Sequence, residues 1–175
     1  MIIAIISDIH DNLTNLDKCL DWCRKNKVVK IICLGDITNS ETINYLSSNF
    51  NGEIFLVRGN IELYEEDELK SYQNINYGGE ISIIEIDNLR IGLCHEPRKI
   101  KKILADDIGK ESGPNIKNNR LDFIFYGHTH KPWLEKDGLT MIINPGNISG
   151  TFYEATFSYL DTTSRKLELK ILKEL

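Results

Sequence analysis

Five short apolar runs, each followed within three residues by Asp, Asn or His, place the strongest constraint on the fold. The runs cover residues 2–6, 28–34, 54–57, 89–93 and 121–126. Apolar residues that continue without alternation are typical of strands buried on both faces, as in parallel sheets. Core packing alone does not require a polar residue of this kind after each run. We therefore expect the five run ends to gather these polar side chains in one place.

Two amphipathic segments lie between the first three runs. Asn12 can cap a helix whose apolar side chains fall on one face. Ser40 can cap a second helix, which carries Glu41 in its first turn. Strand, helix, strand, helix and strand at this spacing predict a βαβαβ unit of a parallel sheet.

The pattern changes in the second half of the chain. We expect an acidic surface segment at residues 61–70, a hairpin at 81–93, a short helix at 97–106 and a loop at 107–120. Two buried strands are expected at 121–126 and 140–143, and a closing hairpin at 155–172. Asp87-Asn88 suits the turn of the first hairpin. No repeat, low-complexity tract or linker interrupts the chain. Residues 1–175 are therefore expected to form one α/β domain of two packed mixed sheets with helices outside.

Composition excludes several classes of protein. The chain has 175 residues, of which 41% are hydrophobic and 27% charged, as in one soluble globular domain. A net charge of −5 without a basic face argues against a long nucleic acid as partner. The apolar start meets Asp8 too soon for a signal peptide or membrane span, so we expect a cytoplasmic protein. Four cysteines without CxxC pairing are interpreted as buried hydrophobes in a reducing compartment, with a thiolate metal site as the alternative.

The polar residues after the apolar runs form a set of metal donors. They are Asp8, His10, Asp36, Asn60, His95, His128 and His130. Because loops at the carboxyl ends of parallel strands converge on the ligand crevice, we expect all seven to face one site. Seven donors are too many for one ion but suit two ions about 3.5–4 Å apart that share a carboxylate. Mixed carboxylate and imidazole donors favour Mn, Fe, Zn, Ni or Co over Ca or Mg.

Each of these residues also has an ordinary explanation. Asp8 and Asp36 can cap helices, and Asn60 alone is more often a turn residue than a ligand. Capping does not explain the partnering histidines, however. All four histidines of the chain belong to the set. The metal site therefore accounts for more of the pattern than separate structural roles do.

These residues resemble the signature of a known family. Asp8-x-His10, Gly35-Asp36, Gly59-Asn60, His95 and Gly127-His128-Thr129-His130 are similar, in this order, to the motifs of the calcineurin-like metallophosphoesterase superfamily. Asn144-Pro145-Gly146 and the closing hairpin resemble its compact bacterial and archaeal phosphodiesterase branch. The resemblance extends from residue 1 to about residue 172 and implies a four-layer αββα sandwich.

The resemblance also implies a mechanism. One ion is expected on Asp8, His10, Asp36 and His130, and a second on Asn60, His95 and His128, with Asp36 shared. We expect two divalent ions, manganese first, with nickel, cobalt, iron, zinc or magnesium as alternatives. A hydroxide bridging the ions would attack phosphorus, with Asn60, His10 and His95 taking part in catalysis. The expected substrates are small phosphodiesters or nucleotides.

Two positions depart from the family pattern. Ile61 stands where many members carry a histidine that protonates the leaving group, so turnover is expected to depend steeply on leaving-group pKa. Glu96 follows His95 where relatives usually carry glycine, and it adjusts either the second ion's surroundings or substrate entry.

Other readings stay open. The same fold serves as a non-catalytic metal-binding scaffold in a eukaryotic retromer subunit, and a phosphomonoesterase is a further alternative. A homodimer and a monomer fit the composition equally. The basic run at residues 98–102 is interpreted as a solvated helix face before a phosphate site, and Arg58 as a surface residue or an anion contact. Tyr64 and Tyr153 are candidates for an aromatic rim.

Overall fold

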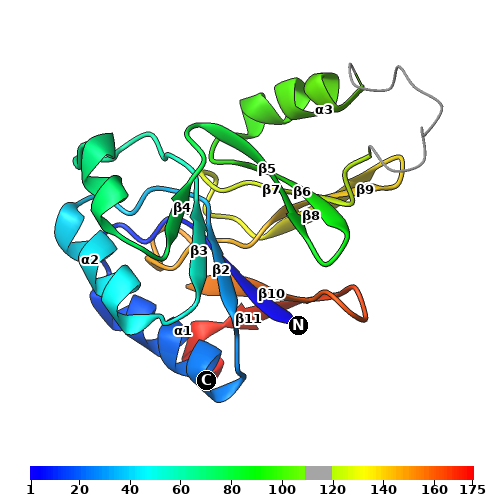
Figure 1. Cartoon of the computed structure of the whole chain (residues 1–175). Coiled ribbons are helices and arrows are strands. Elements are labelled where there is room, and N and C mark those ends of the chain that lie inside the picture. Colours follow the sequence, from blue (N-terminus) through cyan, green and yellow to red (C-terminus); the bar gives the residue numbers. More distant parts are fainter. Residues whose placement is uncertain (109–119) are drawn as a thin grey trace.

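Two β-sheets pack face to face, and helices cover their outer faces (Figure 1). The computed structural model describes residues 1–108 and 120–175. The strand order is β11-β10-β1-β2-β3-β4 in the first sheet and β5-β6-β7-β9-β8 in the second. Each sheet contains parallel and antiparallel pairs, which confirms the predicted α/β class with two mixed sheets.

The first sheet is built on the predicted βαβαβ unit. Its strands are β1 (Ile2–Ile6), β2 (Lys30–Cys33), β3 (Glu53–Leu56), β4 (Ile75–Tyr77), β10 (Thr156–Asp161) and β11 (Lys166–Ile171). β1 to β4 run parallel, and β10 pairs antiparallel with both β1 and β11. The helices α1 (Leu13–Lys25) and α2 (Ser40–Asn49) lie on its outer face (Figure 1).

The second sheet contains the middle of the chain. Its strands are β5 (Ile81–Ile86), β6 (Leu89–Cys94), β7 (Phe123–Phe125), β8 (Trp133–Asp137) and β9 (Thr140–Asn144). β6, β7 and β9 run parallel, whereas β5 and β8 are antiparallel edge strands. The helix α3 (Ile100–Ile108) covers this sheet, and short 3₁₀ helices lie at η1 (Glu66–Ser71), η2 (Pro97–Lys99) and η4 (Leu172–Glu174).

Two strands and one cap differ from the sequence predictions. β4 has only three residues, and all five residues of β8 are exposed, so neither shows the burial pattern that marks a strand. The N-cap of α2 is Asn39, not Ser40, because the Asn39 side chain accepts hydrogen bonds from the first helical N–H groups. The loop expected at 107–120 falls mostly on residues outside the described part.

Burial on both faces explains the continuous apolar runs. In β1, Ile3 and Ile5 pack between the two sheets, whereas Ala4 and Ile6 pack against the helices outside. Burying one such large aliphatic side chain contributes about 1.5–3 kcal/mol. A third apolar cluster lies between the second sheet and α3. The four cysteines are buried free thiols, as predicted.

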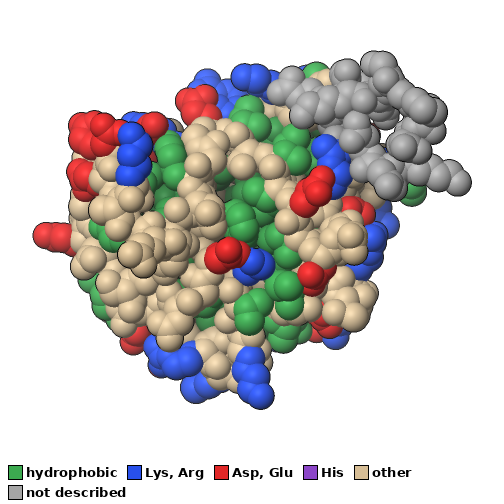
Figure 2. Space-filling model, viewed as in Figure 1, with side chains coloured by type: hydrophobic (Ala, Val, Ile, Leu, Met, Phe, Trp, Pro, Cys, Tyr) green, Lys and Arg blue, Asp and Glu red, His purple; other side chains and the backbone are tan. Residues whose placement is uncertain are grey.

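One face of the molecule carries a mixture of hydrophobic and charged side chains (Figure 2). On the face shown in Figure 2, hydrophobic side chains lie between charged ones, and no histidine is visible. His128 is exposed. Among the described residues, no helix is long and apolar enough to cross a membrane.

Candidate metal centre

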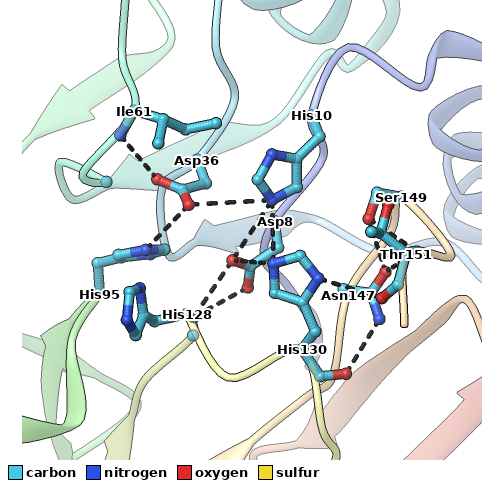
Figure 3. A network of polar contacts seen from close by, with 12 residues as sticks. Asp8, His10, Asp36, Ile61, His95, His128, His130, Asn147, Ser149 and Thr151 are labelled. Atoms are coloured by element: carbon cyan, nitrogen blue, oxygen red, sulfur yellow. Dashed lines mark hydrogen bonds and ion pairs between the residues drawn. The ribbon is translucent and has the colours of Figure 1, made fainter. Parts of the chain in front are cut away.

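The seven predicted donors follow five strand ends and lie together at one edge of the two sheets. Asp8 and His10 follow β1, Asp36 follows β2, Asn60 follows β3, His95 follows β6, and His128 and His130 follow β7. Figure 3 shows the two carboxylates between the four imidazole rings. β1, β2 and β3 belong to one sheet and β6 and β7 to the other. The site therefore depends on how the two sheets pack.

The backbone turns sharply at most of these residues. Five of them have left-handed φ angles: Asp8 (54°), His10 (47°), Asp36 (53°), His128 (70°) and His130 (58°). Such a conformation costs a non-glycine residue of order 1–3 kcal/mol and clusters at functional sites. The packed sheets stabilise it and so aim the side chains inward.

The first group of donors contains Asp8, His10 and His130. The Nε2 atoms of His10 and His130 lie 3.0 Å apart. Asp8 Oδ1 lies 3.3 Å from His130 Nε2 and 3.8 Å from His10 Nε2. One donor atom from each residue lies within 4.8 Å of the others, which is the spacing of ligands around a single ion.

The second group contains Asp36, His95 and His128, and Asn60 lies against it. His95 Nε2 lies 3.2 Å from Asp36 Oδ2. Asn60 Oδ1 lies 2.9 Å from His95 Nε2 and 2.7 Å from His128 Nδ1. Here too the donor atoms of the three titratable residues lie within 4.8 Å of one another.

Asp36 lies between the two groups. Its Oδ2 atom is 3.2 Å from His95 Nε2 and 3.9 Å from His10 Nε2. Its Oδ1 atom accepts hydrogen bonds from the backbone N–H groups of Asn60 and Ile61, at 2.8 and 3.2 Å. One oxygen thus fixes the carboxylate, and the other faces both donor groups.

Backbone carbonyls orient two of the imidazoles. His95 Nδ1 donates to the carbonyl of Leu34 at 2.7 Å, and His130 Nδ1 donates to the carbonyl of Thr151 at 3.2 Å. When Nε2 gives up its proton, as a metal ligand must, a ring that donates through Nδ1 keeps its lone pair on Nε2. In both rings Nε2 points toward the carboxylates, as a metal ligand requires.

The charges of the site call for a cation. Burial alone would raise the pKa of Asp8, but hydrogen bonds with His10 and His130 hold it well below its usual range. Burial opposes ionisation of Asp36 in the same way, and its hydrogen bond with His95 lowers its pKa. Both carboxylates are buried, and within the described residues only histidines form ion pairs with them. Buried anions without lysine or arginine partners fit divalent cations.

Two glycines allow the strand-end loops to approach closely. A Cβ atom on Gly59 would lie 2.1 Å from Asp36 Oδ1, and one on Gly127 would lie 1.9 Å from Ser7 Oγ. Any larger residue would displace the loops that carry the ligands. The need for glycine at these turns thus has a direct cause in backbone and side-chain contacts.

Sequence reasoning missed Glu62 as a part of the site. Its carboxylate accepts hydrogen bonds from the backbone N–H groups of Ile37, Thr38 and Gly59, at 3.1, 2.9 and 3.0 Å. It therefore ties the loop after β2 to the loop after β3. No periodicity marks this residue, because its partners come together only in the folded chain.

Asn147 is a second residue that the sequence did not single out. It is fully buried, and its Nδ2 donates to the carbonyl of His130 at 3.0 Å. Its Oδ1 accepts from Gly150 N, Thr151 N and Ser149 Oγ, so one side chain organises the loop beside His130 (Figure 3). Its place in an Asn- and Gly-rich stretch after a buried strand was the available signal.

Comparison with known proteins agrees with this geometry. A family model described as the calcineurin-like phosphoesterase superfamily domain matches residues 1–165. The chain belongs to the calcineurin-like phosphoesterase superfamily. The phosphodiesterase MJ0936 of Methanocaldococcus jannaschii is 27% identical over 177 residues, covering 99% of this chain and 100% of that protein. The phosphodiesterase YfcE of Escherichia coli is 26% identical, covering 85% of this chain and 80% of its own length.

Solved structures show the same fold. The structure of an archaeal phosphodiesterase superposes with a TM-score of 0.82 at 26% identity, covering 98% of this chain and 99% of that chain. Vps29 of Chaetomium thermophilum, at 16% identity, has a TM-score of 0.66 and covers 97% of this chain and 96% of its own. The resemblance to this phosphoesterase superfamily, and the sandwich it implied, are confirmed.

The structure shows the surroundings of three residues whose roles the sequence left open, namely Glu96, Arg58 and Tyr64. Glu96 forms ion pairs with Arg98 and Lys99 rather than with a donor residue, at 2.7 and 3.2 Å. Arg58 pairs with Glu66 on the surface. The prediction of Tyr64 as a rim residue is wrong, because its side chain is packed in the core beside the first sheet.

Proposed function

We propose that this chain is a phosphodiesterase that uses two divalent ions to hydrolyse small phosphodiesters. The observation that carries the proposal is the pair of donor groups that share Asp36. Phosphodiesterase relatives in archaea and bacteria, MJ0936 and YfcE, support the reaction class. A cytoplasmic protein of one domain over residues 1–175 is part of the same proposal.

We assign one ion to Asp8, His10 and His130 and a second to Asn60, His95 and His128, with Asp36 shared. When bound, such ions supply Lewis acidity to phosphoryl oxygens and lower the pKa of water toward neutrality. Manganese is our first choice, because mixed carboxylate and imidazole donors suit it and its neighbours in the transition series. Fixed Nε2 atoms on His95 and His130 reduce the reorganisation needed on binding.

Asn60 has a further role toward the substrate. Its oxygen faces His95 and His128, so its amide N–H₂ group is left to donate to a phosphoryl oxygen. The Asn60 side chain is exposed at the mouth of the site. A donor held there stabilises negative charge that develops on the phosphoryl group.

The leaving group receives little help from the chain. Ile61 offers no proton, and its backbone N–H is engaged by Asp36 Oδ1 at 3.2 Å. Good leaving groups such as nitrophenolate depart without a proton, whereas alkoxides need one. The enzyme is therefore expected to favour diesters with acidic leaving groups.

The test is hydrolysis of bis(p-nitrophenyl) phosphate by metal-stripped protein, with Mn, Ni, Co or Mg added in turn. His130→Ala should abolish metal-dependent turnover and reduce the number of ions bound per chain. Asp21→Asn, an exposed carboxylate on α1 that pairs with Arg24, is the matched control and should behave as wild type.

The alternatives give different results. Turnover of p-nitrophenyl phosphate above that of the diester would indicate a phosphomonoesterase. Binding of two ions without turnover of either ester would contradict the enzymatic proposal and favour a metal-binding scaffold. If the chain binds only one ion, and substitutions in either donor group abolish that binding to the same extent, the dinuclear assignment is contradicted.

A further inference from the structure

A cleft lies directly beside the proposed metal centre. It has a volume of about 370 Å³ and is lined by Tyr126, Thr129, Lys131, Trp133 and Tyr153. Thr129 is the residue between His128 and His130, so one wall of the cleft is continuous with the centre. Nothing in the proposed reaction so far uses this cleft.

The loop that carries Tyr153 is attached to the centre as well. The carbonyl of Thr151 accepts the hydrogen bond from His130 Nδ1, and the ring centroid of Phe152 lies 5.6 Å from that of His130. Phe152 is 87% exposed and has a φ of 66°. The part of the cleft that Tyr153 lines is therefore positioned by the same histidine that we assign to an ion.

Aromatic rings make up most of the cleft. Tyr126 is buried at its base, whereas Trp133 and Tyr153 remain 49% and 46% exposed. The Trp133 indole N–H donates to Glu135 at 3.4 Å, and Lys131 Nζ lies 5.3 Å from the centroid of the Trp133 ring. These contacts hold the indole in place before any ligand binds, which lowers the entropic cost of stacking on it.

The polar groups of the cleft are also available. Lys131 is exposed, and no carboxylate in the described ranges forms an ion pair with its ammonium group. Thr129 Oγ1 accepts a hydrogen bond from Asn144 Nδ2 at 3.0 Å, which leaves its own proton to donate. Aromatic faces beside one cation and one hydroxyl suit a planar ring with polar substituents.

We propose that this cleft binds the aromatic or nucleobase group of a phosphodiester whose phosphate lies at the metal centre. The inference rests on the proposed function and specifies its substrate class. Small dialkyl phosphodiesters would leave the cleft empty, whereas a nucleotide diester would place its base against Trp133 and Tyr153.

The exposed edge strand β8 offers a competing explanation, in which Trp133 contacts a second copy of the chain. Leu134 separates the two explanations. It follows Trp133 on the same strand and is absent from the lining of the aromatic cleft. It lines a second groove with Leu167 and Leu169 of β11, which Trp133 also borders. An interface along this edge would use both residues, whereas a substrate cleft would use Trp133 alone.

The first test compares three esters that share the p-nitrophenolate leaving group: the methyl, phenyl and thymidine 5′-phosphate esters. Since the leaving group is constant, the part of any difference in kcat/KM that a substitution in the cleft removes reports binding of the other ester group. Stacking of one base on an aromatic side chain is worth about 1–3 kcal/mol, which corresponds to about 5- to 150-fold in binding. We expect a preference of this size for the phenyl and thymidine esters over the methyl ester.

Variants then locate the preference. Trp133→Leu and Tyr153→Leu should each reduce the ratio of thymidine to methyl ester kcat/KM toward one. Leu134→Ala should keep the wild-type ratio. Equal rates for all three esters in the wild type would overturn the inference while leaving the phosphodiesterase proposal intact. If Leu134→Ala also lowers the ratio of thymidine to methyl ester kcat/KM and dissociates a dimer, the edge strand β8 is an interface between two copies of the chain instead.

A binding measurement separates the cleft from the reaction. The chain has two tryptophans, so Trp22→Phe leaves Trp133 as the only indole reporter. Thymidine 5′-monophosphate should quench its fluorescence saturably in metal-free protein, and methyl phosphate should not. Quenching without hydrolysis of any ester would support the cleft and contradict the proposed function. If neither quenching nor hydrolysis is observed, the cleft proposal and the proposed function are both overturned. Hydrolysis with a preference for the thymidine ester but without quenching would place the aromatic site outside the cleft.

Discussion

Glu62 provides the sharpest test of how the metal centre is held together. Its carboxylate accepts three backbone hydrogen bonds, from Ile37, Thr38 and Gly59. Hydrogen bonds to a charged group contribute about 1.5–3 kcal/mol each. Ile37 is buried, whereas Thr38 and Gly59 are partly exposed and can bind water instead. Glu62→Ala should therefore lower the free energy of unfolding by about 2–4 kcal/mol, below the simple sum.

The same change should weaken metal binding. Glu62 joins the loop that carries Asp36 to the loop that carries Asn60, although it touches neither donor group. Loss of such a supporting contact typically costs about 10- to 100-fold in metal affinity. Glu62→Gln should show about half the loss of stability, because its amide oxygen still accepts while its N–H₂ group faces other donors.

Urea unfolding of the metal-free protein and titration with manganese measure the two effects. Glu53→Ala is the matched control: Glu53 is exposed and pairs with Lys30, so its removal should cost less than about 1 kcal/mol. The reasoning would be refuted if Glu62→Ala unfolded like the wild type and lost activity only on alkyl esters. That result would make Glu62 the acid that protonates the leaving group.

Three further predictions concern other parts of the molecule. A series of aryl and alkyl diesters should show rates that fall steeply as leaving-group pKa rises, and equal rates for nitrophenyl and alkyl esters would contradict the lack of an acid at Ile61. Gly127→Ala would place a Cβ atom 2.9 Å from Asp8 Oδ2. It should therefore lower both the melting temperature and the affinity for manganese, with an overpacking cost of about 1–3 kcal/mol. An unchanged melting temperature would show that the loop adapts and would contradict this prediction. Burial raises the pKa of Cys33 and of Cys94 to about 12, so a thiol reagent at pH 8 should label these two cysteines only after unfolding, and rapid labelling of the native protein would contradict their burial.

The sequence by itself determined which polar residues gather at the candidate site, and it determined the class of fold. Continuous apolar runs specify strands buried on both faces, and such strands place whatever follows them at one sheet edge. All four histidines followed these runs, so their number and order already indicated a metal site. Asp87-Asn88 likewise specified its hairpin, because both residues adopt the left-handed φ that this turn requires.

Tertiary structure decided what short-range pattern cannot encode. β8 is exposed along its length and is recognisable only by its pairing with β9. Glu62 and Asn147 act on backbone groups far along the chain or across a loop, and neither belongs to a periodic pattern. Tyr64 and Tyr153 look alike in sequence, yet packing buried the first and left the second beside the metal centre. Burial and long-range hydrogen bonds depend on which segments meet, and that is settled only when the two sheets pack together.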